Sequence, residues 1–463
     1  MKNTSLNLSF IIGITAVSAM GGLLFGYDWV VIGGAKPFYE RFFDITTSPY
    51  LQGWAMSSAL IGCLIGAVSS GVLADRYGRK LMLILAAIMF TVSAIGTGAV
   101  SEFSLFIVYR LLGGLGIGLA SAISPMYIAE ISPAHLRGRL VSINQLTIVI
   151  GILGAQIVNY LIAQPVDPMA DDTAILLSWN GQMGWRWMFW AETVPAAIFF
   201  FLVFLIPESP RYLIKAGRSD KAVFILSRIG GAAYATAEKN EIESTMVDHA
   251  GKARLRDLLD KRVVPVVLIG VVLAVFQQWC GINVVFNYAE EVFVAAGFTV
   301  SDMLFNIVIT GTVNLVFTLV AIRVVDSLGR RKLMLFGSIG LACVYFLLGG
   351  SYMLKLDGIV VLILVLLGIA TYAMTLAPIT WVVLSEIFPN RLRGAAMAVA
   401  TTALWTASFL LTYTFPLLNK ALQAGGTFWL YALICLAGFF FIWKKLPETK
   451  GKTLEEIERE LTK

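Results

Sequence analysis

Long apolar runs, separated by short polar segments, follow one another from the first residues to about position 443. A helix needs about 20 mainly apolar residues to cross the hydrocarbon core of a membrane. Twelve segments of the chain meet this requirement, and the pattern therefore predicts an all-α membrane protein with twelve transmembrane helices. The predicted spans are residues 6–34, 50–74, 81–100, 103–129, 140–163, 186–206, 263–289, 303–322, 333–354, 358–385, 394–419 and 421–443.

A polar interval separates spans six and seven and is too irregular for a single helix. Ser219, ahead of an apolar stretch that stops at Gly230, predicts one short amphipathic helix, and residues 254–262 predict another. Thr453 and Glu456 form a capping-box pattern that predicts a helix in the tail. The expected organisation is a six-helix bundle, a cytoplasmic linker, a second six-helix bundle and a tail helix, at residues 1–206, 207–262, 263–446 and 447–463.

Composition excludes the soluble classes, because 58% of the residues are apolar, 14% are charged and the mean hydropathy is +0.80. The net charge of +6 does not predict nucleic-acid binding, since the basic residues lie between apolar runs. Most of the 35 Lys and Arg residues fall on one side of the predicted membrane, which assigns that side and both termini to the cytoplasm. The exceptions are Lys36, Arg41, Arg110, Arg186, Lys355 and Lys420.

Candidate chemistry is sparse. The four cysteines fall inside apolar stretches without paired spacing, so we expect four buried free thiols and no metal site. No phosphate-binding loop of the type GxxxxGK[ST] is present, which excludes an ATP-driven pump for this chain alone. We expect no cofactor, no enzymatic activity and a monomer in the lipid bilayer. The first apolar run is too long for a cleavable signal and carries Asp28, so it is interpreted as the first span.

Charged motifs recur about half a chain apart, which indicates that a six-helix unit has been duplicated. Each motif puts acidic and basic side chains at the predicted cytoplasmic ends of helices. They could form ion pairs that latch the two halves together, so we predict a gating role; ordinary basic anchors with incidental partners are the alternative. The predicted gating residues are Asp75, Arg79, Glu130, Arg137, Glu208 and Arg211 in the first half, and Asp326, Arg330, Glu386 and Arg393 in the second.

Together these motifs resemble the sugar porter family of the major facilitator superfamily. They lie at residues 75–80, 130–138, 207–211 and 447–450 and at their counterparts in the other half. The resemblance covers the whole chain. It implies the major facilitator fold, with two six-helix halves in parallel repeat that rock about a site near the middle of the membrane.

A polar stripe in span seven is the candidate sugar site. Gln277, Gln278 and Asn283 provide amide donors and acceptors in an otherwise apolar helix, as a molecule with many hydroxyls requires. They also match the family's QQxxGIN pattern. The alternative for the amides is hydrogen bonding between helices.

The resemblance adds further substrate contacts, for which core packing is the alternative: Phe25, Gln145, Asn314, Trp381 and Trp405. Three positions depart from the family pattern: Asn287 stands where a tyrosine is usual, Leu404 where an amide is usual and Ala377 where a Gly-Pro pair is usual. Asn287 is kept as a candidate contact, and the identity of the sugar stays open.

Three ionisable residues sit well inside the predicted spans: Asp28, Arg110 and Glu192. Each costs at least about 2.5 kcal/mol on insertion scales. Asp28 and Arg110 lie at similar depth on spans one and four, so they can meet. The family's proton-coupled members carry the same pair, and Glu192 is a secondary candidate for proton coupling. A permanent ion pair that only orients the two helices is the alternative.

The predicted function is a proton-coupled monosaccharide symporter, for a pentose or a hexose, in a bacterial cytoplasmic membrane. The partners are then a sugar and a proton, and the mechanism is alternating access. A facilitative sugar uniporter is the closest alternative. A drug exporter of the same superfamily is disfavoured by the amide stripe, and a sugar-sensing receptor would need long cytoplasmic extensions.

Overall fold

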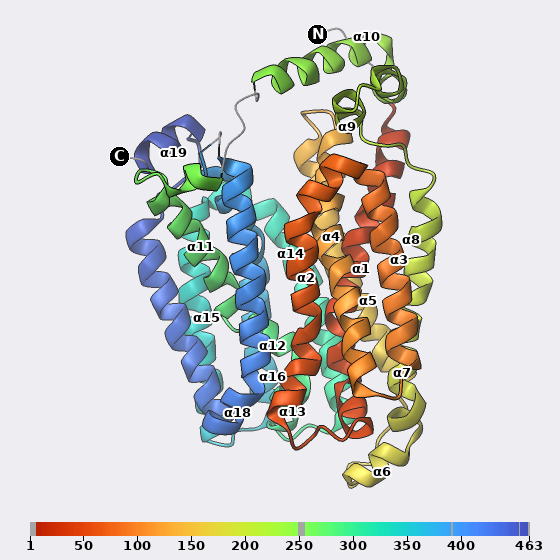
Figure 1. The fold of residues 1–463 in the computed structure, drawn as a ribbon. Helices are drawn as coiled ribbons and strands as arrows, with labels where there is room; N and C mark the ends of the chain where they lie inside the picture. Colours follow the sequence, from red (N-terminus) through yellow and green to blue (C-terminus); the bar gives the residue numbers. More distant parts are fainter. Residues whose placement is uncertain (1–5, 249–254, 390–391, 453, 462–463) are drawn as a thin grey trace.

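The computed structural model describes residues 6–248, 255–389, 392–452 and 454–461 (Figure 1). Within these ranges all regular secondary structure is helical, which confirms the predicted class. Among the described residues, eleven helical stretches are long and apolar enough to cross a membrane. One of them, α18 (Arg393–Lys445), is 53 residues long and is kinked at Gln423, close to the boundary predicted between the last two spans. It therefore supplies two spans, in agreement with the predicted twelve.

The amino-terminal and carboxy-terminal halves form two adjacent bundles, drawn in red to yellow and in green to blue in Figure 1. The first contains α1 (Leu8–Phe42), α2 (Pro49–Tyr77), α3 (Arg79–Ala99), α4 (Phe103–Ile131), α5 (Arg137–Ile162), α6 (Asp172–Leu177), η1 (Asn180–Gly184), α7 (Trp185–Ala191) and α8 (Thr193–Val203). The second contains α11 (Val264–Trp279), α12 (Ile282–Asn287), α13 (Ala289–Val294), α14 (Val300–Leu328), α15 (Arg330–Met353), α16 (Gly358–Met374), α17 (Leu376–Ile387) and α18.

Short elements outside the bundles mark their two ends. At one end lie α9 (Pro210–Lys215), α10 (Ser219–Asp248), η2 (Leu255–Leu259) and α19 (Leu454–Leu461), and we call it the linker end (Figure 1). At the opposite end lie α6 and α13, and we call it the far end. The predicted tail helix is present as α19, although the capping residue Thr453 lies outside the described residues.

Close packing inside the first bundle depends on glycine. A side chain at Gly62 on α2 would collide with the backbone of Leu111 on α4, and one at Gly114 on α4 would collide with Ala59 on α2. Helices that lack a Cβ at the crossing point approach closely and gain van der Waals contact, the usual driving force for helix association in lipid. Across the two halves, α2 packs on α18 and α5 packs on α14.

Several predicted helices differ from the observed ones. The first span extends to Phe42, eight residues beyond its predicted end, so Lys36 and Glu40 are also buried inside it. The predicted seventh span is broken at Cys280 and Gly281, and the tenth is broken at Thr375. The amphipathic helix from Ser219 ends at Gly230 as predicted, since Gly230 and Gly231 have non-helical backbone angles, but a second helix that was not predicted follows it to Asp248. The helix predicted over residues 254–262 is a short 3₁₀ turn, η2.

Candidate functional site

Two opposite charges meet in the membrane-spanning part of the first half. Asp28 on α1 is 1% exposed and Arg110 on α4 is 2% exposed. Arg110 Nη1 donates a hydrogen bond to Asp28 Oδ1, and Nη2 lies 3.5 Å from the backbone oxygen of Asp28. The structure thus brings together the two residues that the sequence placed at matching depth.

A third ionisable group belongs to the same buried region. Glu192 lies between α7 and α8, and its charge interacts with those of Asp28 and Arg110. Within the described residues, Asp28 Oδ2, Arg110 Nε and Glu192 Oε1 have no hydrogen-bond partner. Leaving a buried polar atom unpaired costs about 1–3 kcal/mol. Free carboxylate oxygens beside a buried cation therefore contribute little to the stability of the fold. They are suited to binding a proton.

The candidate sugar residues form a chain of amides. Gln277 Nε2 donates to the Tyr372 hydroxyl at 2.7 Å, Gln278 Nε2 donates to Gln277 Oε1 at 2.6 Å, and Asn283 Nδ2 donates to Gln278 Oε1 at 2.6 Å. Tyr372 comes from α16 and was not predicted, because its partner is 95 residues away in the sequence. The chain keeps each amide in a fixed orientation with further donors and acceptors free for a ligand.

The break in the seventh span creates this arrangement. Gly281 has φ of 88°, in the left-handed region that favours glycine, and it joins α11 to α12. A side chain there would also lie 2.8 Å from the ring of Tyr431. Because the helix is interrupted, Asn283 turns back to hydrogen-bond Gln278 five residues earlier, which a continuous helix would not allow.

Three aromatic rings meet beside α1 and α18. The ring centroids of Phe25, Trp29 and Trp405 are 5.9 to 6.1 Å apart, in edge-to-face and tilted geometry. Phe25 and Trp405 were predicted and Trp29 was not, although it lies four residues after Phe25 and shares its helical face. Trp381 on α17 is 38% exposed and takes part in none of the ring contacts found among the described residues.

The remaining sugar candidates lie on both halves. Gln145 is half-buried on α5, whereas Asn287 on α12 and Asn314 on α14 are buried. Among the described residues Asn287 Oδ1 has no hydrogen-bond partner. Because α5 and α14 pack against each other across the two halves, the predicted contacts come from both bundles.

An ion-pair cluster that the sequence did not reveal joins the two halves at the far end. Lys36 on α1 is 2% exposed, and its Nζ lies 3.0 Å from Glu40, 3.2 Å from Glu290 and 2.8 Å from Glu291. Arg41 lies 3.4 Å from Glu290 as well. Since Glu290 and Glu291 belong to α13 of the second half, these contacts hold the far end closed. We call Lys36, Glu40, Glu290 and Glu291 the far-end cluster.

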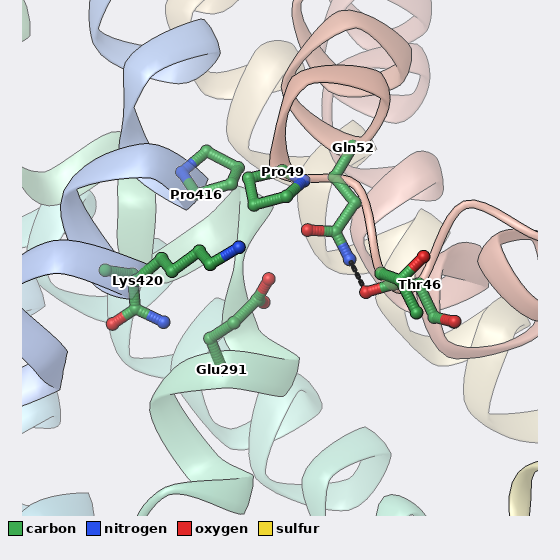
Figure 2. Close-up of a pocket in the computed structure, with 8 residues that line it drawn as sticks. Thr46, Pro49, Gln52, Glu291, Pro416 and Lys420 are labelled. Carbon is green, nitrogen blue, oxygen red and sulfur yellow. Dashed lines mark hydrogen bonds between the residues drawn. The ribbon is translucent and has the colours of Figure 1, made fainter.

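A cavity of about 290 Å³ borders the far-end cluster (Figure 2). Glu291 and Lys420 point toward each other in it, and Gln52 Nε2 donates to the Thr46 carbonyl at 3.0 Å (Figure 2). Gln52 also donates to Glu40 Oε2 at 3.1 Å. The cluster is therefore shielded inside the protein but lies next to a polar opening.

Four of the predicted gating residues of the first half, Asp75, Arg79, Glu130 and Glu208, contact one another at the linker end. Arg79 Nη2 lies 2.8 Å from Glu130 Oε1, and Arg79 Nη1 lies 3.4 Å from Asp75. Glu208 accepts hydrogen bonds from the backbone N–H groups of Arg79 and Lys80 at the start of α3. Arg137 donates to the carbonyl oxygen of residue 129, and Arg211 is exposed.

The second half repeats this arrangement. Arg330 Nε lies 3.3 Å from Glu386 Oε1, and Glu448 accepts from the backbone N–H of Arg330 at 2.9 Å. The side chain of Asp326 lies outside the described residues. The pairs Arg79–Glu130 and Arg330–Glu386 each join elements of one half, so a latch between the halves stays a prediction.

Two equivalent glutamates of the repeat have opposite pKa shifts. Burial raises the pKa of Glu208 above its ordinary value, although three backbone N–H groups donate to the carboxylate. Burial also favours the protonated form of Glu448, but backbone N–H groups from residues 330–332 and 450 hold its pKa below the ordinary value. The fold thus favours the ionised form of Glu448 and the protonated form of Glu208.

Comparison with known proteins gives consistent matches over the whole chain. The model of the family "Sugar (and other) transporter" matches residues 14–461. The chain is 41% identical to the D-xylose-proton symporter of Escherichia coli, with 98% of this chain and 96% of the relative covered. It is 42% identical to a glucose transport protein of Synechocystis, with 98% of each covered. A solved inward-open structure of the Escherichia coli xylose transporter matches with a TM-score of 0.85 at 39% identity, over 97% of this chain and all of the other.

Proposed function

The chain belongs to the sugar transporter family, and on this premise we propose that it is a proton-coupled symporter of a pentose or hexose that works by alternating access. The buried pair of Asp28 and Arg110 carries the proposal. A uniporter has no need of a carboxylate that gains and loses a proton inside the membrane, where each charge is costly. The similarity to the D-xylose-proton symporter of Escherichia coli supports the same conclusion.

The coupling follows from the unpaired atoms of the site. When Asp28 is ionised it accepts from Arg110, which neutralises both charges in a region of low dielectric. Protonation of Asp28 removes its charge and releases Arg110 to a second acceptor, for which Glu192 is available. The sugar-loaded protein can then change state only when Asp28 carries the proton.

The sugar is bound by the amide chain and the aromatic rings. Gln277, Gln278 and Asn283 offer donors and acceptors to hydroxyls, while the trio of Phe25, Trp29 and Trp405 covers an apolar face of the sugar ring. Aromatic rings and neutral amides suit an uncharged polyhydroxylated ligand better than a charged one. Gln145, Asn287, Asn314 and Trp381 are proposed as further contacts.

Gating is proposed to involve both ends of the bundles. We place the linker end and both termini in the cytoplasm of a bacterium, because most of the basic residues lie at that end. The state described here is closed toward the outside by the far-end cluster, and the similarity to an inward-open structure fits this assignment. The repeated charges at the linker end are proposed to pair across the halves in the opposite state.

The two duplicated halves have different roles in the proposed mechanism. We propose residues 1–206 and 263–446 as two bundles that rock against each other, joined by the linker 207–262 and followed by the tail 447–463. The proton site lies in the first bundle and the amide chain in the second. Transport is then coupled because both ligands stabilise the same rearrangement of one bundle against the other.

Uptake of radiolabelled sugar into vesicles with an acidic exterior tests the proposal. A gradient of one pH unit is worth about 1.36 kcal/mol per proton, enough for roughly tenfold accumulation at one proton per sugar. The variant D28N mimics the protonated form, so it should bind sugar but lose gradient-driven accumulation. E102Q, which removes an exposed carboxylate, is the matched control and should accumulate normally. Accumulation that survives D28N would refute the role of Asp28, and wild-type uptake that ignores the gradient would favour a uniporter.

A further inference from the structure

Gln156 on α5 is a buried amide without a hydrogen-bond partner. Its side chain is 2% exposed, and within the described residues neither Oε1 nor Nε2 has a partner. Burying an amide without compensation is unfavourable, and a leucine of similar size would fill the same space without that cost. Both polar atoms are therefore free for a ligand that can donate and accept.

The position of Gln156 places it between the two halves. A side chain at Gly311 on α14 would collide with Gln156 Oε1, so the amide lies directly on the backbone of the opposite bundle. Asn314 follows Gly311 by three residues and shares its helical face. The amide of Gln156 is thus next to a residue that was already proposed to contact the sugar.

The depth of Gln156 agrees with that of Asn287, one of the proposed sugar contacts. A side chain at Gly34 of α1 would collide with Asn159, on the next turn of α5, and one at the adjacent Gly33 would meet the backbone of Asn287. Gln156 therefore lies within about one helical turn of the level of Asn287, at 1.5 Å per residue. Gln145 lies eleven residues earlier on the same helix, or about 16 Å along its axis, so the two amides would lie at opposite ends of the bound sugar.

We propose that Gln156 is a specificity-determining residue that hydrogen-bonds a hydroxyl of the sugar from the first half, opposite Asn287 and Asn314 of the second. This inference rests on the proposed function of sugar transport. A hydroxyl donates and accepts at one oxygen, which matches the two free groups of a single amide. A sugar that lacks this hydroxyl leaves the buried amide unpaired and is rejected, which is the strongest form of discrimination available to a neutral site.

Calorimetric binding of D-xylose, D-glucose and their monodeoxy derivatives to the full-length protein in detergent tests the proposal. In the variant Q156L we expect about tenfold to hundredfold weaker binding of the parent sugar, because its hydroxyl loses a buried partner. One deoxy derivative should bind wild type and Q156L equally, while the other derivatives lose affinity. The melting temperature of Q156L without sugar should be unchanged or higher, which a merely structural role would not give.

A second pair of variants makes the test independent of Q156L. G311A should displace Gln156 and weaken binding by a similar factor in the wild type, but it should have no further effect in the Q156A background. G154A, which adds a methyl group on the same helix where no other atom lies within 4 Å, is the control. Equal losses for every derivative, or unchanged affinity, would overturn the role of Gln156. A wild-type protein that binds no sugar of a full panel of pentoses and hexoses would instead refute the proposed function itself.

Discussion

Replacing Lys36 with methionine should open the far end of the protein. Methionine keeps most of the length of the side chain but removes the charge that holds Glu290 and Glu291 of α13 against α1. The three carboxylates of the far-end cluster would then face one another across the two halves without their central cation. Their repulsion and their hydration both favour separation of the halves at this end.

The distances give the expected size of the effect. At an effective dielectric constant of about 20, a pair of unit charges 3 Å apart interacts by roughly 5 kcal/mol before desolvation is counted. Removing one partner of a buried pair typically costs about 3–5 kcal/mol. Even the lower figure corresponds to a shift of more than a hundredfold in the ratio of closed to open states.

Labelling of a single cysteine measures this shift. Ala289, at the start of α13, is fully buried in the closed state, and an A289C substitution changes its size little. The native thiols, of which Cys343 is the exposed one, are first replaced by serine. In K36M a membrane-impermeant maleimide added from the far end should then react with position 289 at least about tenfold faster.

The matched control is E40Q. Glu40 pairs with Lys36 inside the same helix, so its neutralisation leaves both contacts between the halves in place and should not raise labelling. If K36M labels no faster than E40Q, the far-end cluster does not hold the two halves together. Equal acceleration in both variants would show a general loosening of α1 and would equally refute the reasoning.

Four further predictions concern the amide chain and the linker end. Q277A should weaken sugar binding by about 1–3 kcal/mol in calorimetry, because Gln278 and Tyr372 lose their shared partner; unchanged affinity would remove Gln277 from the site. E130Q should slow transport and raise labelling of a cysteine between the halves at the linker end, and unchanged labelling would count against a latch. E448Q should lower the melting temperature at pH 7, with the difference vanishing as the pH falls through the depressed pKa of Glu448. Because the pKa of Glu208 is raised, its effect on stability has the opposite dependence on pH. Its contribution to the free energy of unfolding is complete below the ordinary pKa of a glutamate and is lost as the pH rises, so E208Q should leave the melting temperature unchanged or higher.

The buried charges show how much of a site can be predicted when each residue is exceptional in its surroundings. Asp28, Arg110 and Glu192 stand out in apolar runs, and the depth of the first two follows from counting residues along straight helices. Lys36 escaped the same reasoning because the predicted first span ended at residue 34. Hydropathy falls at the first charges of a helix, so it underestimates a helix whose polar end is buried by ion pairs.

The broken helices show a second limit. The amides of the seventh span were predicted from their composition, but their mutual hydrogen bonds depend on the turn at Gly281, which a helical periodicity does not reveal. Tyr372 completes the chain from a different helix. In the sequence, Tyr372 is one tyrosine within an apolar span. Its role becomes visible when α16 is placed beside α11.

Hydropathy and motifs were enough to predict the class of protein, the twelve spans, the duplication and the residues whose charge or amide groups are unusual in lipid. These properties are local, because the membrane fixes the length and the polarity of each helix independently of its neighbours. The contacts between helices of the two halves, by contrast, become known only from the folded chain. Contacts between residues far apart in the chain create the far-end cluster, the hydrogen bond of Gln277 and the unpaired amide of Gln156 on Gly311. Helix packing determines those contacts, and in lipid this packing depends on the detailed fit of small side chains.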